Sequence, residues 1–140
     1  MKKIYTLGTG RRSEEDFTEI LHAYNIQSLI DVRSLPKSKL PIFIKENLEE
    51  LLVREGIEYH FLGKELGGFR KGGYAAYAST HDFSKGVDLL ESIALIKPSV
   101  IICAERFPWK CHRKWISREL RKREWEVDHI IDKGKLWIPK

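Results

Sequence analysis

The chain has 140 residues, the usual size of one domain, and 42% of them are hydrophobic, too many for a disordered protein. No apolar stretch reaches the about 20 residues that span a bilayer, so we expect no membrane partner. The formal net charge of +5 is compatible with contact to phosphate or a polyanion, but it decides little alone.

Strand and helix patterns alternate along most of the chain. Short runs of β-branched, aromatic or apolar residues predict strands, and apolar residues spaced three or four apart predict helices with one buried face. We expect Ser13 to cap the first helix, Gly56 to follow the second and Pro98 to follow the third. The pattern predicts strands at residues 3–7, 28–32, 57–61, 100–103, 125–131 and 136–138, and helices within residues 13–24, 44–56, 83–96 and 110–123.

The order of these elements predicts the fold class. It favours an α/β fold, a single three-layer domain over residues 1–140 with a mainly parallel, Rossmann-like sheet and helices on both faces. A turn at residues 132–134 can reverse the chain, which would give an antiparallel C-terminal hairpin. The N-terminal residues lack the features of a signal peptide, so we expect a cytoplasmic protein with reduced cysteines.

Residues 62–80 interrupt the alternation, because they are rich in glycine and show no convincing period. Long irregular segments inside compact domains are usually functional or mobile. Since this one carries Arg70 and Tyr74, we expect it to cover a ligand, and the alternative is a surface loop without a role.

Polar residues follow the predicted parallel strands, and no equivalent gathering exists at the other ends of the strands. Ligands of open parallel sheets bind beyond the carboxyl ends of the strands, so we predict one phosphate-binding site at that edge. The catalytic candidates are Asp31, Glu105, Cys111 and His112, and the ligand-binding candidates are Thr9, Arg33, Ser34, Arg70, Tyr74 and Arg113.

The charged candidates suit a phosphate-bearing substrate. Arg33 and Arg113 would hold the phosphate, and Asp31 or Glu105 would transfer protons. Asp31 and Arg33 share one side of an extended strand end, so the carboxylate could aim the guanidinium at an anion. Equally, Asp31 could cap the next turn while Arg33 braces the sheet.

Cys111 has the sequence environment of a reactive thiol. It lies near the start of the basic helix, beside Lys110, His112 and Arg113, and positive surroundings lower a thiol pKa. Glu105 or His112 could serve as its base. Most such cysteines are nevertheless not catalytic, and Cys103, at the end of a buried strand, is typical of a small core residue.

The sequence lacks the motifs of other common functional sites. The spacing of Cys103 and Cys111 does not fit a zinc site, and neither the phosphate loop of NTPases nor the dinucleotide-binding glycine motif occurs. We therefore predict no metal and no cofactor.

The predicted helix at residues 110–123 is strongly basic, with Glu119 as its acidic residue. Its N-terminal N–H groups can bind phosphate, and Trp109 and Trp115 lie close by, which would suit a nucleic-acid surface. Charge runs are more often solvated helix faces, so both interpretations stay open.

Several motifs occur in the order seen in a known family. They are Tyr5-Thr6-Leu7-Gly8, Asp31-Val32-Arg33-Ser34-Leu35-Pro36-Lys37-Ser38, Leu66-Gly67-Gly68, Cys103-Ala104-Glu105 and Cys111-His112-Arg113. Over nearly its whole length the chain resembles the family called domain of unknown function 488. The resemblance implies a compact α/β domain with these residues clustered, and it implies no particular activity.

Two details concern the likeness to other proteins. Relatives commonly have His and Ser after the first Gly, whereas this chain has Thr9 and Gly10, so the role of that His would fall to Thr9, Arg11 or His112. The segment Asp-Val-Arg at residues 31–33 resembles a short piece of rhodanese-type sulfurtransferases, which would make a cysteine a persulfide carrier. Their catalytic loop is not recognisable in residues 103–113.

The sequence slightly favours an enzyme that acts on a phosphate-bearing substrate, a nucleotide or nucleic acid, because a binding surface alone needs no Cys, Glu and Asp at one edge. The alternative is a non-catalytic nucleic-acid-binding module that uses the basic helix and the glycine-rich segment. A thiol redox or sulfur-transfer protein is the third hypothesis, and it requires a reactive Cys111. The sequence does not determine the oligomeric state.

Overall fold

The computed structural model describes residues 2–36 and 38–138, so Lys37 of the Asp-Val-Arg motif lies outside the described residues. The strands are β1 (Lys2–Gly8), β2 (Ser28–Asp31), β3 (Glu58–Phe61), β4 (Ser99–Cys103), β5 (Trp125–Asp132) and β6 (Lys135–Trp137). The helices are α1 (Glu14–Ala23), α2 (Lys45–Arg54), α3 (Gly63–Leu66), α4 (Tyr74–Tyr77), α5 (His81–Ala94) and α6 (Arg113–Lys122), with 3-10 turns at Pro41–Phe43 and Pro108–Lys110.

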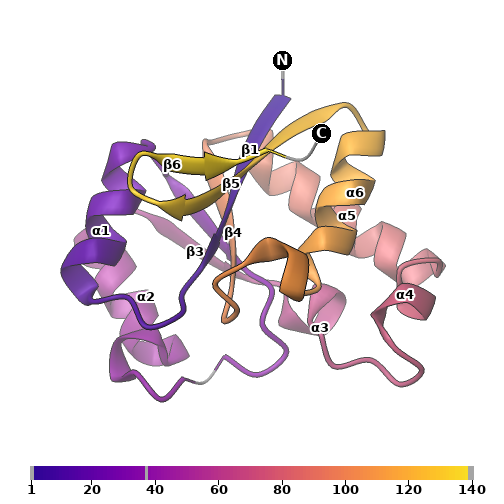
Figure 1. Cartoon of the computed structure of the whole chain (residues 1–140), viewed down its shortest axis with the longest axis horizontal. Coiled ribbons are helices and arrows are strands. Elements are labelled where there is room, and N and C mark those ends of the chain that lie inside the picture. The colour runs from indigo at the N-terminus through magenta and orange to yellow at the C-terminus, as the bar shows by residue number, and fades with distance from the viewer. Residues whose placement is uncertain (1, 37, 139–140) are drawn as a thin grey trace.

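The strands form one six-stranded sheet in the order β3-β2-β4-β1-β5-β6 (Figure 1). The pairs β2–β3, β2–β4, β1–β4 and β1–β5 are parallel, and β6 runs antiparallel to β5. The β5–β6 turn passes through Gly134 at a φ of 77°, a left-handed conformation that glycine adopts without strain. The predicted α/β fold with its C-terminal hairpin is confirmed.

Helices cover the two faces of the sheet as separate layers (Figure 1). On one face, α1 and α2 pack Phe17 and Leu48 against the sheet residues Leu7 and Ile102. On the other face, α3 to α6 form a second core with the remaining inward side chains of β1, β2, β4 and β5. The buried strands β2 and β4 are apolar toward both layers, which is why their sequences read as short uninterrupted hydrophobic runs.

The predicted helix ends agree with the structure at α1 and differ at α6. Ser13 caps α1 by accepting a hydrogen bond from the Asp16 backbone N–H at 3.1 Å. Helix α6 begins at Arg113, three residues later than expected, because the chain first makes the 3-10 turn that starts at Pro108. Cys111 therefore precedes the helix, close to its N-terminus.

The segment at residues 62–80 is more ordered than its composition predicts, since it contains α3 and α4. Its glycines permit close packing: a Cβ on Gly67 would lie 2.3 Å from Ser34 Oγ, and one on Gly63 would lie 2.1 Å from the Arg33 carbonyl oxygen. The segment is thus fitted against the loop that follows β2. None of the helices in the described ranges combines the length and apolar composition that crossing a membrane requires.

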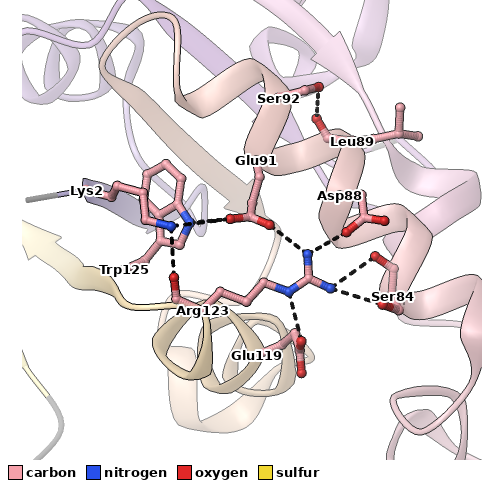
Figure 2. Close-up of polar contacts among 9 residues, drawn as sticks. All are labelled: Lys2, Ser84, Asp88, Leu89, Glu91, Ser92, Glu119, Arg123 and Trp125. Atoms are coloured by element: carbon pink, nitrogen blue, oxygen red, sulfur yellow. Dashed lines mark hydrogen bonds and ion pairs between the residues drawn. The ribbon is translucent and has the colours of Figure 1, made fainter.

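An ion-pair network around Arg123 joins α5 to α6 and to the strands at the amino end of the sheet (Figure 2). The Arg123 guanidinium donates to Asp88 at 2.6 Å, to Glu91 at 2.7 Å and to Glu119 at 2.9 Å. Glu91 also accepts a hydrogen bond from the Trp125 indole at 2.7 Å. Arg123 is therefore a structural residue whose charge three carboxylates already neutralise.

Replacing this arginine should destabilise the fold. In Arg123→Met, Asp88, Glu91 and Glu119 lose their shared cation, and we expect the free energy of unfolding in urea to fall by about 1–3 kcal/mol. The control is Lys122→Met, which removes an exposed cation from the end of α6 and should change the free energy by less than about 0.5 kcal/mol. Equal effects of the two substitutions would contradict the structural role of Arg123.

Candidate functional site

A cavity of about 550 Å³ opens at the carboxyl edge of the sheet, where β2 and β4 lie side by side. The chain that leaves β2 continues into α2 on one face, whereas the chain that leaves β4 continues into α6 on the opposite face. Diverging connections of this kind leave a crevice between the strand ends, which is the usual place of a ligand in an open parallel sheet. The predicted location of the site thus coincides with the cavity.

Both cysteines lie in this cavity and form a close pair. Cys103 ends β4, and the 3-10 turn at Pro108–Lys110 brings Cys111 back over it, so that the two sulfur atoms are 2.8 Å apart. Both thiols are free; Cys103 is 2% exposed and Cys111 is half-buried. The expectation that Cys103 is a core residue describes its burial but misses its contact with the second sulfur.

Arg113 lies beneath the Cys111 sulfur and is 0% exposed. Its backbone N–H and its Nε each donate to Cys111 Sγ at 3.2 Å. Its terminal nitrogens donate to Thr6 Oγ1 at 3.1 Å and to the backbone carbonyl oxygen of Glu105 at 2.6 Å. No carboxylate of the described residues pairs with this guanidinium, so the Cys111 sulfur is the acceptor in contact with it that can carry a negative charge.

The two thiols are driven to opposite protonation states. The hydrogen bond from Cys103 lowers the pKa of Cys111 far below that of an ordinary thiol, and His112 and Arg113 act in the same direction against the effect of burial. Burial raises the pKa of Cys103, and the neighbouring Cys111 adds to this effect. At neutral pH the pair therefore consists of a Cys111 thiolate and a Cys103 thiol that donates to it.

A neutral histidine lies next to the Thr6 hydroxyl that Arg113 contacts. Thr6 Oγ1 accepts a hydrogen bond from Arg113 and lies 2.6 Å from His129 Nδ1. Burial lowers the pKa of His129 to about 3, with Arg113 contributing, so this ring carries no charge at neutral pH. His129 therefore adds no second positive charge beside Arg113.

His112 joins the cavity to the loop after β2. Its Nε2 lies 2.8 Å from the Val32 carbonyl oxygen, and a carbonyl only accepts, so Nε2 carries a hydrogen and donates it. A Cβ on Gly68 would lie 2.8 Å from Nδ1, which explains the need for glycine there. The ring also packs against Tyr74 at a centroid distance of 5.2 Å.

Asp31 and Arg33 make the contacts of a structural brace. Arg33 Nε and Nη2 donate to the two Asp31 carboxylate oxygens at 2.9 and 2.8 Å, and Nη1 donates to the Phe43 carbonyl oxygen at 2.6 Å. The Tyr59 hydroxyl donates to Asp31 at 2.6 Å, and burial raises the pKa of that tyrosine. Of the two interpretations left open by the sequence, these buried contacts favour the brace. Proton transfer by Asp31 and phosphate binding by Arg33 stay predictions that no contact supports.

The other predicted residues divide into two groups. Ser34, Tyr74 and Glu105 line the cavity, where Ser34 Oγ accepts from the Phe69 N–H at 2.9 Å. Thr9 and Arg70 do not line it.

Both outlying residues have structural contacts instead. The Thr9 backbone N–H donates to the Cys103 carbonyl oxygen at 2.8 Å. The Arg70 guanidinium lies 3.7 Å above the Tyr77 ring and holds the turn at residues 64–70 through the carbonyl oxygens of Lys64 and Gly67.

Some cavity residues had not been assigned to this site from the sequence. Phe69, Trp109, Lys110, Lys114 and Trp115 line the mouth. The mixture of aromatic and basic residues between 107 and 115 is the signal that could have identified four of them, and no such signal marks Phe69. No group of three potential metal ligands occurs within residues 2–36 and 38–138.

Comparison with known proteins identifies a family. Searches of curated proteins and of solved structures found no match. The family described as "Domain of unknown function DUF488" matches residues 13–120, which include β2, β4, both cysteines and Arg113. The chain therefore belongs to the DUF488 family.

Proposed function

We propose that this protein is a thiol–disulfide oxidoreductase in which Cys111 is the nucleophile and Cys103 the resolving thiol. The observation that carries the proposal is the buried Arg113, which has no carboxylate partner among the described residues and holds the Cys111 sulfur 2.8 Å from Cys103. Positively charged surroundings of this kind activate a thiolate for attack on another sulfur. In the reducing cytoplasm, where we place the protein, both cysteines would rest in the reduced state, without a disulfide between them.

The first step transfers one substrate sulfur to the protein. The Cys111 thiolate attacks one sulfur of a disulfide R–S–S–R′, a bond forms between Cys111 and that sulfur, and R′–S⁻ leaves. The half-buried Cys111 faces the cavity, so the substrate sulfur can approach from the open side while Arg113 remains beneath.

The second step resolves the mixed disulfide. Cys103 attacks Cys111, a Cys103–Cys111 disulfide forms, and the substrate leaves as R–SH with the proton that Cys103 gives up. The first step removes the negative charge of Cys111, which had kept Cys103 protonated, and leaves Arg113 to favour a thiolate at Cys103. The substrate gains two electrons, and an external dithiol returns the protein to its reduced state.

A phosphate-bearing substrate would have to be bound by residues other than those predicted from the sequence. Arg33 is engaged by Asp31, and Arg113 is buried, so an anionic substrate group would meet Lys110 and Lys114 at the mouth of the cavity instead. A nucleotide or nucleic acid remains compatible with such a mouth.

The non-catalytic nucleic-acid-binding module has less support. Arg123, one of the cations expected to contact nucleic acid, is held by carboxylates of α5 and α6. Arg118 and Lys122 are exposed on α6, but such residues are usual on a solvated helix face.

Alkylation should reveal a thiolate that persists in mild acid. Because the pKa of Cys111 is lowered, we expect its rate of reaction with iodoacetamide to change less than about twofold between pH 8 and pH 6. An ordinary thiol, with a pKa of about 8.5, would lose about tenfold in rate per pH unit. Cys111→Ser should abolish the fast reaction, and an ordinary pH profile of the wild type would contradict the proposed nucleophile.

The roles of the two sulfurs can be counted with 4,4′-dithiodipyridine at one equivalent per chain. The reduced wild type should release both thiopyridone groups and retain no adduct, because Cys103 resolves the mixed disulfide. Cys103→Ser should release one group and retain the other, which mass spectrometry detects as an adduct on Cys111. A wild type that keeps the adduct would show that Cys103 does not resolve it.

Oxidation should make the fold less stable. A disulfide closing this short loop would stabilise the protein by about 2–3 kcal/mol, but leaving the buried Arg113 without an anion costs about 3–5 kcal/mol. We therefore expect the oxidised protein to have a free energy of unfolding about 1–2 kcal/mol below that of the reduced protein. Its urea midpoint should be lower accordingly. Cys103→Ser, which cannot form the disulfide, should show no such dependence on redox state, and an oxidised wild type of higher stability would contradict the role of Arg113.

A further inference from the structure

The mouth of the cavity carries positive charge that the protein does not neutralise. Lys110 and Lys114 both line the cavity, and neither forms an ion pair with a carboxylate of the described residues. Their ammonium groups lie instead over aromatic rings, at 5.9 Å from the centre of Phe107 and 5.5 Å from that of Trp115. A ligand anion could therefore approach both lysines without displacing a protein carboxylate.

The carboxylate in the cavity lining does not cancel this charge. Glu105 is exposed, and its Oε1 accepts a hydrogen bond from the Phe107 backbone N–H at 3.3 Å. Its backbone oxygen, rather than its carboxylate, contacts Arg113. The two lysines thus outnumber the acid at the entrance to the sulfur pair.

Aromatic side chains form the rest of the mouth. Phe69 is 77% exposed and Trp109 is 44% exposed, and both line the cavity, so their rings are accessible to a ligand there. Trp109 is held in place, because it stacks on Phe107 at 5.0 Å and meets the edge of Trp137 at 5.1 Å. A rigid aromatic surface next to a nucleophile can orient a flat or apolar group of the substrate.

The size of the cavity is compatible with a small ligand. A volume of about 550 Å³ lies within the range of about 300–1,000 Å³ that is typical of small-molecule sites. A protein disulfide would have to insert its sulfur atoms between the aromatic side chains of the mouth.

Building on the proposed function, we propose that the substrate is a low-molecular-weight disulfide that carries an anionic group, a carboxylate or a phosphate, next to an aromatic or other flat apolar group. Lys110 and Lys114 bind the anion, Trp109 and Phe69 contact the apolar group, and the Cys111 thiolate attacks the sulfur between them. The lysines determine which substrate is preferred, whereas Arg113 and Cys103 determine how reactive the thiolate is.

Matched disulfides separate these two effects. We would measure the rate constants of the reduced wild type with 5,5′-dithiobis(2-nitrobenzoate), which is aromatic and anionic, with 4,4′-dithiodipyridine, which is aromatic and neutral, and with cystamine, which is cationic. Each rate is divided by that of a neutral free thiol, N-acetylcysteine amide, to remove the intrinsic reactivity of the reagent. We expect the order anionic, neutral, cationic, with the anionic preference declining as salt is raised.

Removal of the lysines should lower only the reaction with the anion. In the double variant Lys110→Gln, Lys114→Gln, we expect the normalised rate with the anionic disulfide to fall about tenfold and that with the neutral disulfide to stay within about twofold. The control is Lys122→Gln, which removes an exposed lysine of the same helix that does not line this cavity. Trp109→Leu should slow both aromatic disulfides relative to cystamine.

The possible failures are distinguishable. If the neutral disulfide reacts rapidly with Cys111 but neither charge nor the double variant changes the ratios, the anionic substrate is ruled out and the oxidoreductase stands. A faster reaction with the protein disulfides of insulin than with the anionic reagent would also overturn the proposed substrate class. If the neutral disulfide does not react selectively with Cys111, the proposed function fails, and the substrate class fails with it.

Discussion

The chemistry of the site depends on one buried positive charge that lacks a carboxylate partner. The other strongly engaged arginines of the described chain each meet acids: Arg12 contacts Asp16 and Asp132, Arg33 contacts Asp31, and Arg123 contacts three carboxylates. Arg113 is the most buried of these four, yet its neighbours are a hydroxyl, two carbonyl oxygens and a sulfur. A buried cation requires a compensating anion, and the Cys111 sulfur can provide it.

The surrounding structure keeps this arrangement in place. The short 3-10 turn after β4 positions Cys111 over both Cys103 and Arg113, and the Thr6 hydroxyl, which contacts the neutral His129, accepts a hydrogen bond from the guanidinium. Gly8 is required for the same reason, because a Cβ there would lie 2.0 Å from the Glu105 carbonyl oxygen that Arg113 contacts. The Arg113 guanidinium is thus surrounded by β1, the loop after β4 and the start of α6.

The fold was predictable from the sequence because its signals are local. The apolar face of α1, the Ser13 cap and the uninterrupted apolar run of β4 each reflect the element that carries them, and parallel topology follows from their order. The site was predictable only as a location. The pairing of Arg33 with Asp31, two residues away, was open to prediction from the sequence. The surroundings of Arg113 were not, because its contacts with carbonyl oxygens and a sulfur depend on how the loop after β4 folds. The sulfur contact likewise depends on the turn at Pro108, which no spacing rule for cysteines describes.

In the proposed reaction, the one cation beside the sulfur pair would also set the order of the two steps. While Cys111 is a thiolate, its charge keeps Cys103 protonated, so the buried thiol cannot compete for the substrate. Once Cys111 enters a mixed disulfide, Arg113 again lacks an anion, and the nearest group that can supply one is Cys103, 2.8 Å from Cys111. The same unmet charge that activates the first sulfur then favours ionisation of the second. Among the described residues, the ammonium groups of Lys110 and Lys114 make no hydrogen bond to either sulfur, so in the proposed reaction these two side chains act on the substrate.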